Sequence, residues 1–347
     1  MSESANSSPQ PLDQAPEAAG KSSFNFAKFW DDFGMTLLFV VLFAACALSI
    51  NNFLSWANMK GLGQAVFVTG MVSCGMVFCL ACGDLDLSVG AVVACAGVIT
   101  AWLMREAATS WGMDQTSSMI VGMLGGVLTG VFFGTINGLC IAVLKNNALI
   151  VTLAVMWMAR GTGYIMCDNG KPIGIANDLF LDFGYSSIGP IPTPIVLTAI
   201  CFVVFGIILH QTSFGRNTLA MGGNEEAARL AGVNVTRTKI LIFTMTGAIA
   251  AFAGVVLTAK LTSGQPMNGM GLELNAISAC VLGGVSLKGG IGRMPTVLAG
   301  VLILGTVDNA MNLMNIDSFH QHVVRGAILL LAINLDQYKQ KLRFSST

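Results

Sequence analysis

The sequence predicts an all-α membrane protein in which ten transmembrane helices follow one another and both termini lie in the cytoplasm. Of the 347 residues, 54% are hydrophobic and only 10% are charged, whereas about 25% of residues are charged in a typical soluble domain. Ten apolar segments are near the roughly 20 residues that cross a bilayer, although two of them are shorter or interrupted. Lysine and arginine are also distributed asymmetrically over the loops that connect these segments.

Three parts divide the chain. Residues 1–25 are rich in Ser, Ala, Pro, Gln and Glu and contain no apolar stretch. They are predicted to form a disordered cytoplasmic tail rather than a cleaved signal peptide. Residues 26–343 form the predicted transmembrane domain, which includes a polar loop at 212–239, and residues 344–347 are the C-terminal end.

Each of the ten apolar segments within 26–343 is predicted to cross the bilayer. The eighth is short and is interrupted by Gly283 and Gly284, so a complete crossing and a re-entrant segment both remain open. In chain order the segments are 35–53, 61–82, 87–104, 118–144, 148–167, 192–210, 240–259, 272–285, 295–313 and 323–335.

The charge distribution predicts the orientation of these segments. With the N-terminus inside, 12 of the 18 Lys and Arg residues fall on the cytoplasmic side and 4 on the outer side, while Arg160 and Arg325 lie inside spans. Cytoplasmic loops of membrane proteins carry the excess of Lys and Arg. Because an odd number of spans would place the basic segment after residue 335 outside, we expect ten spans with both termini inside.

The loop at 212–239 is the longest polar interruption after the N-terminal tail, and it is predicted to contain a short helix. Asn224 suits the N-cap, Glu225 and Glu226 lie in the first turn, and Gly232 can take the left-handed position after the last turn. Between these ends Ala227, Ala228, Leu230 and Ala231 form a small apolar face. A helix this short is not stable alone in water. We therefore expect it to be held by the membrane domain and to dock a partner protein, the alternative being an ordinary surface loop.

Charged residues inside the spans predict an ion pair. Asp308 and Arg325 lie almost equally far on either side of the turn near residues 316–317, so the antiparallel hairpin should bring them to the same depth. A charge at membrane depth is costly and is paired or functional by default. The prediction is a structural ion pair, with a substrate site as the alternative. Arg160 is placed in a wet crevice or at the outer interface.

Neutral polar residues at membrane depth predict a path for a polyol. These candidates for contact with a substrate are Asn137, Asn275, Ser278, Asn309 and Asn312. For each of them the alternative is a hydrogen bond between packed helices. Glycines recur at every fourth residue in the fourth span, at Gly122, Gly126, Gly130, Gly134 and Gly138. On one helix face, this spacing lets a neighbouring backbone come close.

No catalytic, cofactor-binding or metal-binding residues are predicted. The glycine-rich turn 283–292 lacks the G-x-x-x-x-G-K-[ST] pattern of a phosphate-binding loop. His320 and His322 stand alone near an outer turn, and no nucleophile, base and orienting group occur together. The net charge of zero makes nucleic acid an unexpected partner.

Five motifs carry a resemblance to a known family. They are GDLDLSVG at 83–90, FGTING at 133–138, ALIVTL at 148–153, FGRNTLAMGGNEEAARLAGV at 214–233 and ISACVLGGVSLKGGIGR at 277–293. The chain resembles the membrane permease subunits of bacterial ABC importers for pentoses and hexoses over residues 26–343. Within this group, 262–292 and 304–316 are most similar to the members that carry L-arabinose. Asp84 departs from the family pattern, and its charge has no assigned role at this stage.

The resemblance implies a fold like that of type II ABC importers and a set of partners. Such permeases are homodimers in the bacterial inner membrane, with one sugar path between the subunits. A periplasmic sugar-binding protein docks outside, and a separate ATPase subunit, which binds ATP and Mg²⁺, docks inside. The implied function is therefore import of a monosaccharide, with L-arabinose favoured, by a subunit that is not itself an enzyme and binds no cofactor.

The same resemblance implies that 214–233 couples the permease to the ATPase subunit. The implied coupling residues are Phe214, Gly215, Arg216, Gly222, Gly223, Asn224, Glu225, Glu226, Ala228, Arg229 and Gly232. Two other functions compete with this one. An ion-coupled secondary sugar transporter would need a titrating carboxylate in the membrane, for which Asp308 is the candidate. A membrane-embedded enzyme or scaffold would need a catalytic constellation.

Overall fold

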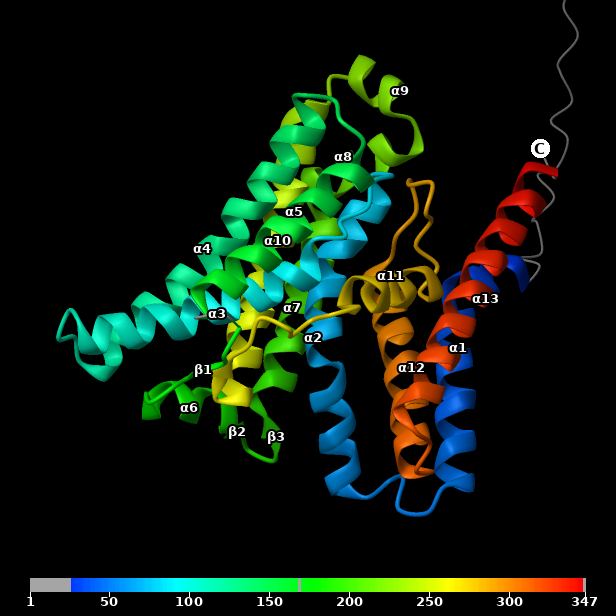
Figure 1. Cartoon of the computed structure of the whole chain (residues 1–347). Coiled ribbons are helices and arrows are strands. Elements are labelled where there is room, and N and C mark those ends of the chain that lie inside the picture. Colours follow the sequence, from blue (N-terminus) through cyan, green and yellow to red (C-terminus); the bar gives the residue numbers. More distant parts are fainter. Residues whose placement is uncertain (1–25, 168–169, 346–347) are drawn as a thin grey trace, which may run out of the picture.

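A computed structural model describes residues 26–167 and 170–345, which form an elongated bundle of helices (Figure 1). The predicted tail at 1–25 and the last two residues of the chain lie outside the described residues. The helices are α1 (Phe26–Ser49), α2 (Trp56–Ala81), α3 (Val89–Thr109), α4 (Gln115–Ala142), α5 (Ala148–Met166), α6 (Asp178–Tyr185), α7 (Thr193–Gln211), α8 (Ser213–Gly223), α9 (Glu225–Leu230), α10 (Val235–Leu261), α11 (Leu272–Leu282), α12 (Met294–Leu313) and α13 (Ser318–Ser345).

Seven of the described helices are long and apolar enough to cross a membrane: α2, α3, α4, α5, α7, α10 and α12. The segments Gly34–Ser49 in α1 and Leu272–Leu282 in α11 are shorter apolar helices. All ten predicted spans coincide with a helix, but the eighth is an 11-residue helix. At 1.5 Å per residue it spans only about half of the hydrocarbon core. The count of ten crossings thus stays a prediction.

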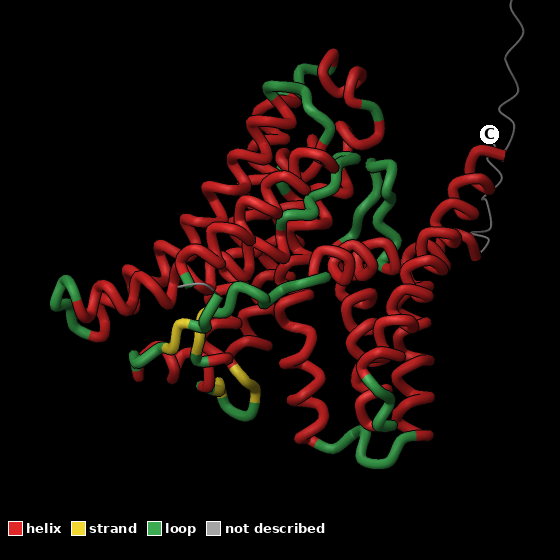
Figure 2. Tube along the Cα trace, in the orientation of Figure 1, coloured by secondary structure: helices red, strands yellow, loops and turns green. Residues whose placement is uncertain are grey.

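Two short helices and four short strands are additions to the predicted elements. Helix α8 precedes α9 in the polar loop, where only one helix was expected, and α6 lies in the loop after the fifth span. Strand β1 (Ile173–Gly174) pairs antiparallel with β4 (Ser263–Gly264), and β2 (Ser187–Ile188) pairs with β3 (Ile191–Pro192) in a hairpin. Each strand has two residues. The tube in Figure 2 shows these strands at the end of the bundle opposite α9.

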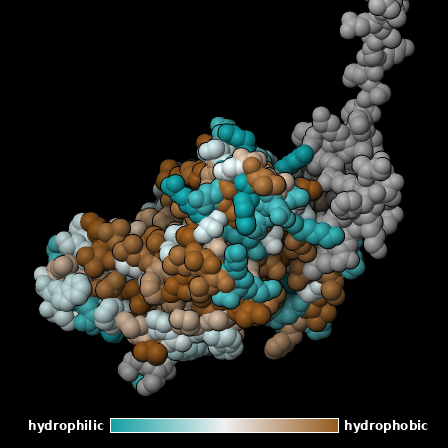
Figure 3. All heavy atoms as spheres, turned by 90° about the horizontal axis from the view of Figure 1, so that it is seen from above, coloured by the Kyte–Doolittle hydropathy of each residue, from teal (hydrophilic) through white to brown (hydrophobic). Residues whose placement is uncertain are grey.

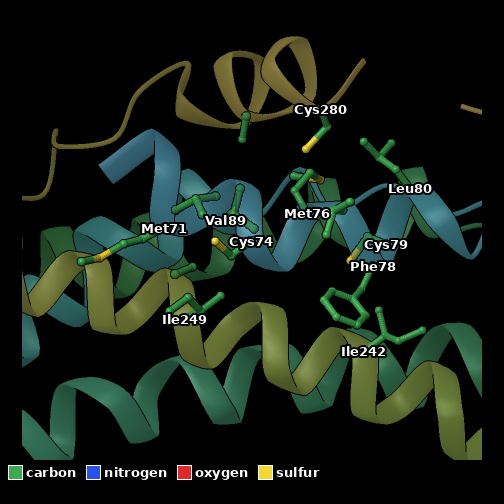
Figure 4. Packing of buried hydrophobic residues seen from close by; sticks show 14 of the residues in the cluster. Met71, Cys74, Met76, Phe78, Cys79, Leu80, Val89, Ile242, Ile249 and Cys280 are labelled. Carbon is green, nitrogen blue, oxygen red and sulfur yellow. The ribbon is translucent and has the colours of Figure 1, made fainter. Parts of the chain in front are cut away.

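The buried core is centred on α2. Its residues from Gly70 to Ala81 are all buried, and α2 contacts α10, α7, α12 and α11. Figure 4 shows Phe78 and Met76 of this helix between Ile242 and Ile249 of α10 and Cys280 of α11. A helix that is apolar on every side is stable only when neighbours surround it. Helix α2 therefore links the group formed by α3, α4, α5 and α10 to the group formed by α1, α11, α12 and α13.

The glycine stripe of α4 lies against two neighbouring helices. A Cβ atom added at Gly130 or Gly134 would collide with backbone atoms of Gly247 or Phe243 in α10, and one at Gly138 would lie 2.7 Å from Cα of Ile240. Gly122 and Gly126 lie against α3, where the nearest atoms belong to the side chains of Met104 and Thr100. The close backbone approach predicted from the four-residue spacing is therefore present, and α4 and α10 pack without intervening side chains at these positions.

Four loops meet at one end of the bundle, which is the upper end in Figure 1. They are the turn 82–88 between α2 and α3, the turn 143–147 between α4 and α5, the segment 212–234 with α8 and α9, and the loop 283–293 between α11 and α12. These are the loops assigned to the cytoplasmic side in the sequence. The C-terminal part of α13 extends toward the same end.

Substitution of Gly134 by alanine is expected to lower the free energy of unfolding by about 1–3 kcal/mol, because the added methyl group meets backbone atoms of α10 that cannot move aside as a side chain would. Thermal unfolding of the purified chain in detergent measures this loss. The matched control is Gly61→Ala in α2, where a Cβ atom meets nothing within 4 Å. There the helix propensity of alanine should give a gain of up to about 1 kcal/mol. Equal midpoints for the two variants would contradict the packing.

Candidate functional site

Helix α8 is anchored to the transmembrane core through its first and last turns. Thr212 is its N-cap, and its hydroxyl oxygen accepts a hydrogen bond from the backbone N–H of Gly215 at 3.2 Å. The ring of Phe214 stacks on Phe78 of α2 with centroids 5.9 Å apart. Gly215 lies against the backbone of Leu209 without room for a side chain. The N-terminal half of α8 is therefore fixed on α2 and on the end of α7.

The C-terminal end of α8 contacts the loop 283–293 and the end of α2. The backbone N–H of Gly290 donates to the carbonyl of Ala81 at 2.9 Å. Gly222 lies against both of these groups, and a Cβ atom there would collide with the Ala81 carbonyl. Gly290 itself has φ of +79°, which favours glycine. The glycines at 222 and 290 are thus required by a three-way backbone contact.

Helix α9 has the ends that the sequence predicts. The side-chain oxygen of Asn224 accepts from the backbone N–H of Ala227 at 2.9 Å, and Glu225 and Glu226 lie in the first turn. Gly232 has φ of +90°, and the backbone N–H of Val233 donates to the carbonyl of Ala228 at 3.0 Å. These contacts cap both ends of a helix that has only six residues.

One part of the apolar face of α9 is buried against the protein, and the other part is exposed. Ala228 is buried against the core, whereas Leu230 has 86% of its surface exposed. Ala227 and Ala231 are also exposed. Arg216 and Glu226, on α8 and α9, are exposed as well. Helix α9 therefore presents a leucine and two alanines outward at the end of the bundle, among charged groups.

Lys239 connects α9 to the turn between α2 and α3. Its ammonium nitrogen lies 3.0 Å from Oδ2 of Asp84 and 3.1 Å from Oε2 of Glu225. Glu225 also pairs with Arg229 at 3.0 Å through its other oxygen. Only 14% of the Lys239 side chain is exposed. Asp84, whose charge had no assigned role in the sequence, is thus one of two carboxylates that compensate a largely buried lysine.

The residues of this ion-pair cluster border a groove at the upper end. The groove has about 1440 Å³ of empty volume, part of it open to the surroundings. It is bordered by the turn 143–147 on one side and by α9 and the start of α10 on the other, with Lys145, Glu225 and Lys239 among its residues. Seen from above, hydrophilic residues gather over the middle of this end and apolar residues cover its flanks (Figure 3).

A second buried polar cluster lies in the same turn. Ser88 donates to Oδ1 of Asp86 from its backbone N–H at 2.9 Å and from its hydroxyl at 2.6 Å. The side-chain amide of Asn137 donates to the hydroxyl of Ser88 at 2.9 Å. Asp86 is 1% exposed, and its burial raises its pKa from 3.8 to about 6, although the hydrogen bonds from Ser88 oppose the rise. Asn137 thus joins α4 to the turn 82–88 and is separate from the other four predicted path residues.

Those four residues lie on α11 and α12, in different environments. Asn309 and Asn58 of α2 exchange two amide hydrogen bonds of 2.8 and 2.9 Å. Asn312 accepts from the side-chain amide of Gln321 at 2.8 Å, and the hydroxyl of Ser278 donates to the carbonyl of Leu274 in its own helix. Asn275 lines a pocket between α2 and α12. The two charged residues of the hairpin meet as well: Arg325 Nε donates to Asp308 Oδ1 at 2.8 Å.

Arg160 is half-buried and holds the segment that leads into α11. Its Nη1 atom donates to the carbonyl oxygens of Pro266 and Asn268 at 2.6 and 2.8 Å. A charge-assisted hydrogen bond to a carbonyl is stronger than a neutral one. The arginine inside the fifth span therefore fixes the irregular backbone that precedes the half-length helix.

A bundle of membrane-length helices, with polar loops gathered at one end and a short exposed helix among them, defines a multi-span membrane permease. A family model described as "Branched-chain amino acid transport system / permease component" matches residues 59–333. The chain belongs to this family of permease components, which are bacterial inner-membrane proteins.

Individual relatives cover nearly the whole chain. The L-arabinose transport system permease protein AraH of Escherichia coli (strain K12) is 56% identical over 94% of this chain and 96% of its own length. The L-arabinose ABC transporter permease protein AraH of Azospirillum brasilense is 43% identical over 96% and 97%. The ribose import permease protein RbsC of Bacillus subtilis (strain 168) is 39% identical over 87% and 91%. No solved structure matches the chain.

The stability of the chain is expected to fall as the pH rises from about 4 to about 6, because of Asp86. Native Asp86 keeps its proton up to a pKa of about 6, whereas the unfolded chain releases it near 3.8. In this window the native state binds more protons, so rising pH removes up to about 3 kcal/mol. Asp86→Asn should abolish that part of the change, measured as unfolding midpoints in detergent between pH 4.5 and 7.

The same substitution at Asp182, which is exposed, is the matched control and should leave the pH dependence in place. Identical pH dependence in the wild-type chain and in Asp86→Asn would contradict a buried, proton-binding Asp86.

Proposed function

We propose that this chain is the permease subunit of an ATP-binding cassette importer that carries L-arabinose across the inner membrane. The identity of 56% over nearly the full length to a permease of an L-arabinose transport system supports this sugar. The second relative, at 43%, carries the same sugar in its name. Energy comes from ATP hydrolysed by a separate ATPase subunit, and a periplasmic sugar-binding protein delivers the sugar.

The proposed arrangement is a homodimer of ten-span subunits like that of type II importers, with both termini in the cytoplasm. The loops with the excess of Lys and Arg meet at the upper end in Figure 1, which supports a cytoplasmic placement of that end. In this arrangement the half-length α11 and the extended segment before it together complete the eighth crossing. Irregular backbone at membrane depth is tolerated where protein surrounds it, and the contacts of Arg160 with Pro266 and Asn268 meet that condition.

The observation that carries the proposal is the exposed face of α9 on an otherwise well-anchored segment. Leu230, Ala227 and Ala231 form an outward apolar face on a helix that would not persist alone in water. The proposed occupant is a cleft of the ATPase subunit. Arg216, Glu226 and Arg229 would supply the polar rim, and the glycines at 215, 222, 223 and 232 shape the segment behind it.

Coupling follows from the contacts behind α9. When the ATPase dimer closes on ATP, a movement of α9 would pass to the start of α10 and to the turn 82–88 through Lys239. It would pass to α2 through the stacked rings of Phe214 and Phe78. Packed helices change between discrete arrangements rather than deforming continuously. The two arrangements would expose the sugar path alternately to the outside and to the inside.

Transport measurements in vesicles test the proposal. Vesicles that contain the chain and its ATPase subunit should take up L-arabinose only when ATP and the binding protein are supplied, and an ionophore that collapses ion gradients should leave uptake unchanged. Uptake that needs an ion gradient and not ATP would instead establish a secondary transporter.

One variant tests the docking helix in the same vesicles. Leu230→Glu places a charge on the outward face of α9 without touching the core, so it should abolish binding of the ATPase subunit and uptake. Ile188→Glu is the control, because Ile188 is also largely exposed, at 63%, and belongs to β2, which lies at the opposite end. It should leave binding of the ATPase subunit intact.

A further inference from the structure

A small pocket in the membrane domain is lined by polar side chains. The ion pair between Asp308 and Arg325 uses only some of their hydrogen-bonding groups. The pocket lies between α2, α11, α12 and α13, with about 400 Å³ of empty volume that is partly open to the surroundings. Its apolar wall includes Val66, Leu304 and Val301. Its polar residues are Thr69, Asn275, Asp308 and Arg325, one from each of the four helices.

These polar residues have hydrogen-bonding capacity to spare. Within residues 26–167 and 170–345, the side chains of Thr69 and Asn275 make no hydrogen bond. The only contact that links Asp308 to Arg325 runs from Nε to Oδ1. The two terminal nitrogens of the guanidinium and the second carboxylate oxygen have no partner among the described residues. About 30% of each of these two side chains is exposed, at 29% and 31%.

Unpaired polar groups at membrane depth require an explanation. No water competes for them in the hydrocarbon core, so each unsatisfied group is costly unless it faces a wet path or a ligand. The neighbouring asparagines show the alternative: Asn309 is paired with Asn58, and Asn312 with Gln321. Amide contacts of this kind hold helices together. Asn275 differs from these two asparagines because its side chain has no hydrogen-bond partner among the described residues, although it lies beside a charged pair.

We infer that Thr69, Asn275, Asp308 and Arg325 form a contact site for a monosaccharide on its way through the membrane. The inference rests on the proposed function and adds the site. Sugar hydroxyls both donate and accept hydrogen bonds, so they can satisfy the carboxylate oxygen of Asp308, the guanidinium of Arg325 and both ends of the Asn275 amide. The carbon face of the pyranose ring would lie on Val66 and Leu304.

The shape of the pocket suits a brief contact rather than tight storage. Much of the space beside these residues is open to the surroundings and little of it is enclosed, whereas pockets that store a ligand bury most of its surface. The lining residues can therefore touch only part of a monosaccharide at a time. A path must release its cargo, and weak contacts on one side serve that purpose. The ion pair at this depth has two functions in this view, since it cancels the buried charge and keeps polar atoms available to the sugar.

Protection of a cysteine from alkylation tests the site on the purified chain in detergent, without transport. Ala65 is exposed and lines the pocket, so Ala65→Cys is treated with a thiol reagent in the presence of L-arabinose, and the modified peptide is followed by mass spectrometry. Ala57→Cys, exposed on the same helix and outside the pocket, is the control. Glycine betaine at equal osmolality replaces the sugar in a parallel arm.

The expected result is a several-fold slower alkylation at residue 65 with L-arabinose, with no effect at residue 57 or with betaine. Adding Asn275→Leu should raise the half-protecting sugar concentration about five- to tenfold, as expected for the loss of one or two hydrogen bonds. Asn334→Leu, which removes an exposed amide of α13 that bonds only within its own helix, should leave that concentration unchanged.

Unprotected alkylation at residue 65, or equal slowing at residues 65 and 57, would overturn the inference. Transport separates this failure from that of the proposed function. If wild-type vesicles take up L-arabinose with ATP while residue 65 is unprotected, the proposed import function is supported and the proposed sugar-contact site is refuted. Protection at residue 65 in a chain whose vesicles show no ATP-dependent uptake would support the site and refute the importer.

Discussion

The largely buried ammonium group of Lys239 is the constraint on which the upper end of the molecule depends. It lies within 3.1 Å of carboxylates from two other segments, Asp84 in the turn after α2 and Glu225 in α9. Lys239 and Asp84 are only 14% and 16% exposed, so removing either partner would leave a largely buried charge uncompensated. Glu225, which is 45% exposed, adds a weaker contact from α9. A six-residue helix with little stability of its own is thereby joined to the transmembrane core at a defined place.

The packing behind this cluster explains why a movement at α9 would reach the membrane. Phe214 stacks on Phe78, and the carbonyl of Ala81 accepts from Gly290 beside Gly222, so α2 contacts α8 and the loop 283–293 within one turn of its end. Glycine contacts between α4 and α10 leave no compressible side chains at the closest points. Interiors packed in this way transmit displacement and do not absorb it.

Much of the fold could be predicted from sequence patterns, each of which has one physical cause. The length of apolar segments located every long helix, and the four-residue glycine spacing predicted the face of α4. Local rules also sufficed for α9, because the cap at Asn224 and the left-handed Gly232 need only neighbouring residues. Asp308 and Arg325 lie almost equally far on either side of the hairpin turn near residues 316–317, and this predicted their contact. In an antiparallel hairpin, residues at equal distances from the turn lie at the same depth in the membrane.

Contacts between remote segments could not be predicted in this way. Asp84 and Lys239 are far apart in sequence, and nothing local shows that each compensates the other. Helix α8 was missed because its glycines lower helix propensity, and the contacts of Phe214 and Gly222 that stabilise it are tertiary. The five polar candidates for the sugar path looked alike in the sequence. Only their hydrogen-bond partners distinguish Asn137, Asn309 and Asn312, each of which is bonded to a side chain of another segment, from Asn275.

The most direct test of the account is the number of sugar molecules taken up per ATP hydrolysed in vesicles that contain the complete transporter with Lys239→Met or Lys239→Arg. The methionine variant leaves Asp84 and Glu225 without their shared cation. The account predicts that its ATPase subunit still binds and hydrolyses ATP while uptake per ATP falls toward zero, and that arginine, which keeps the charge, retains most of the ratio. An unchanged ratio in the methionine variant would contradict the claim that this ion-pair cluster connects α9 to the membrane domain.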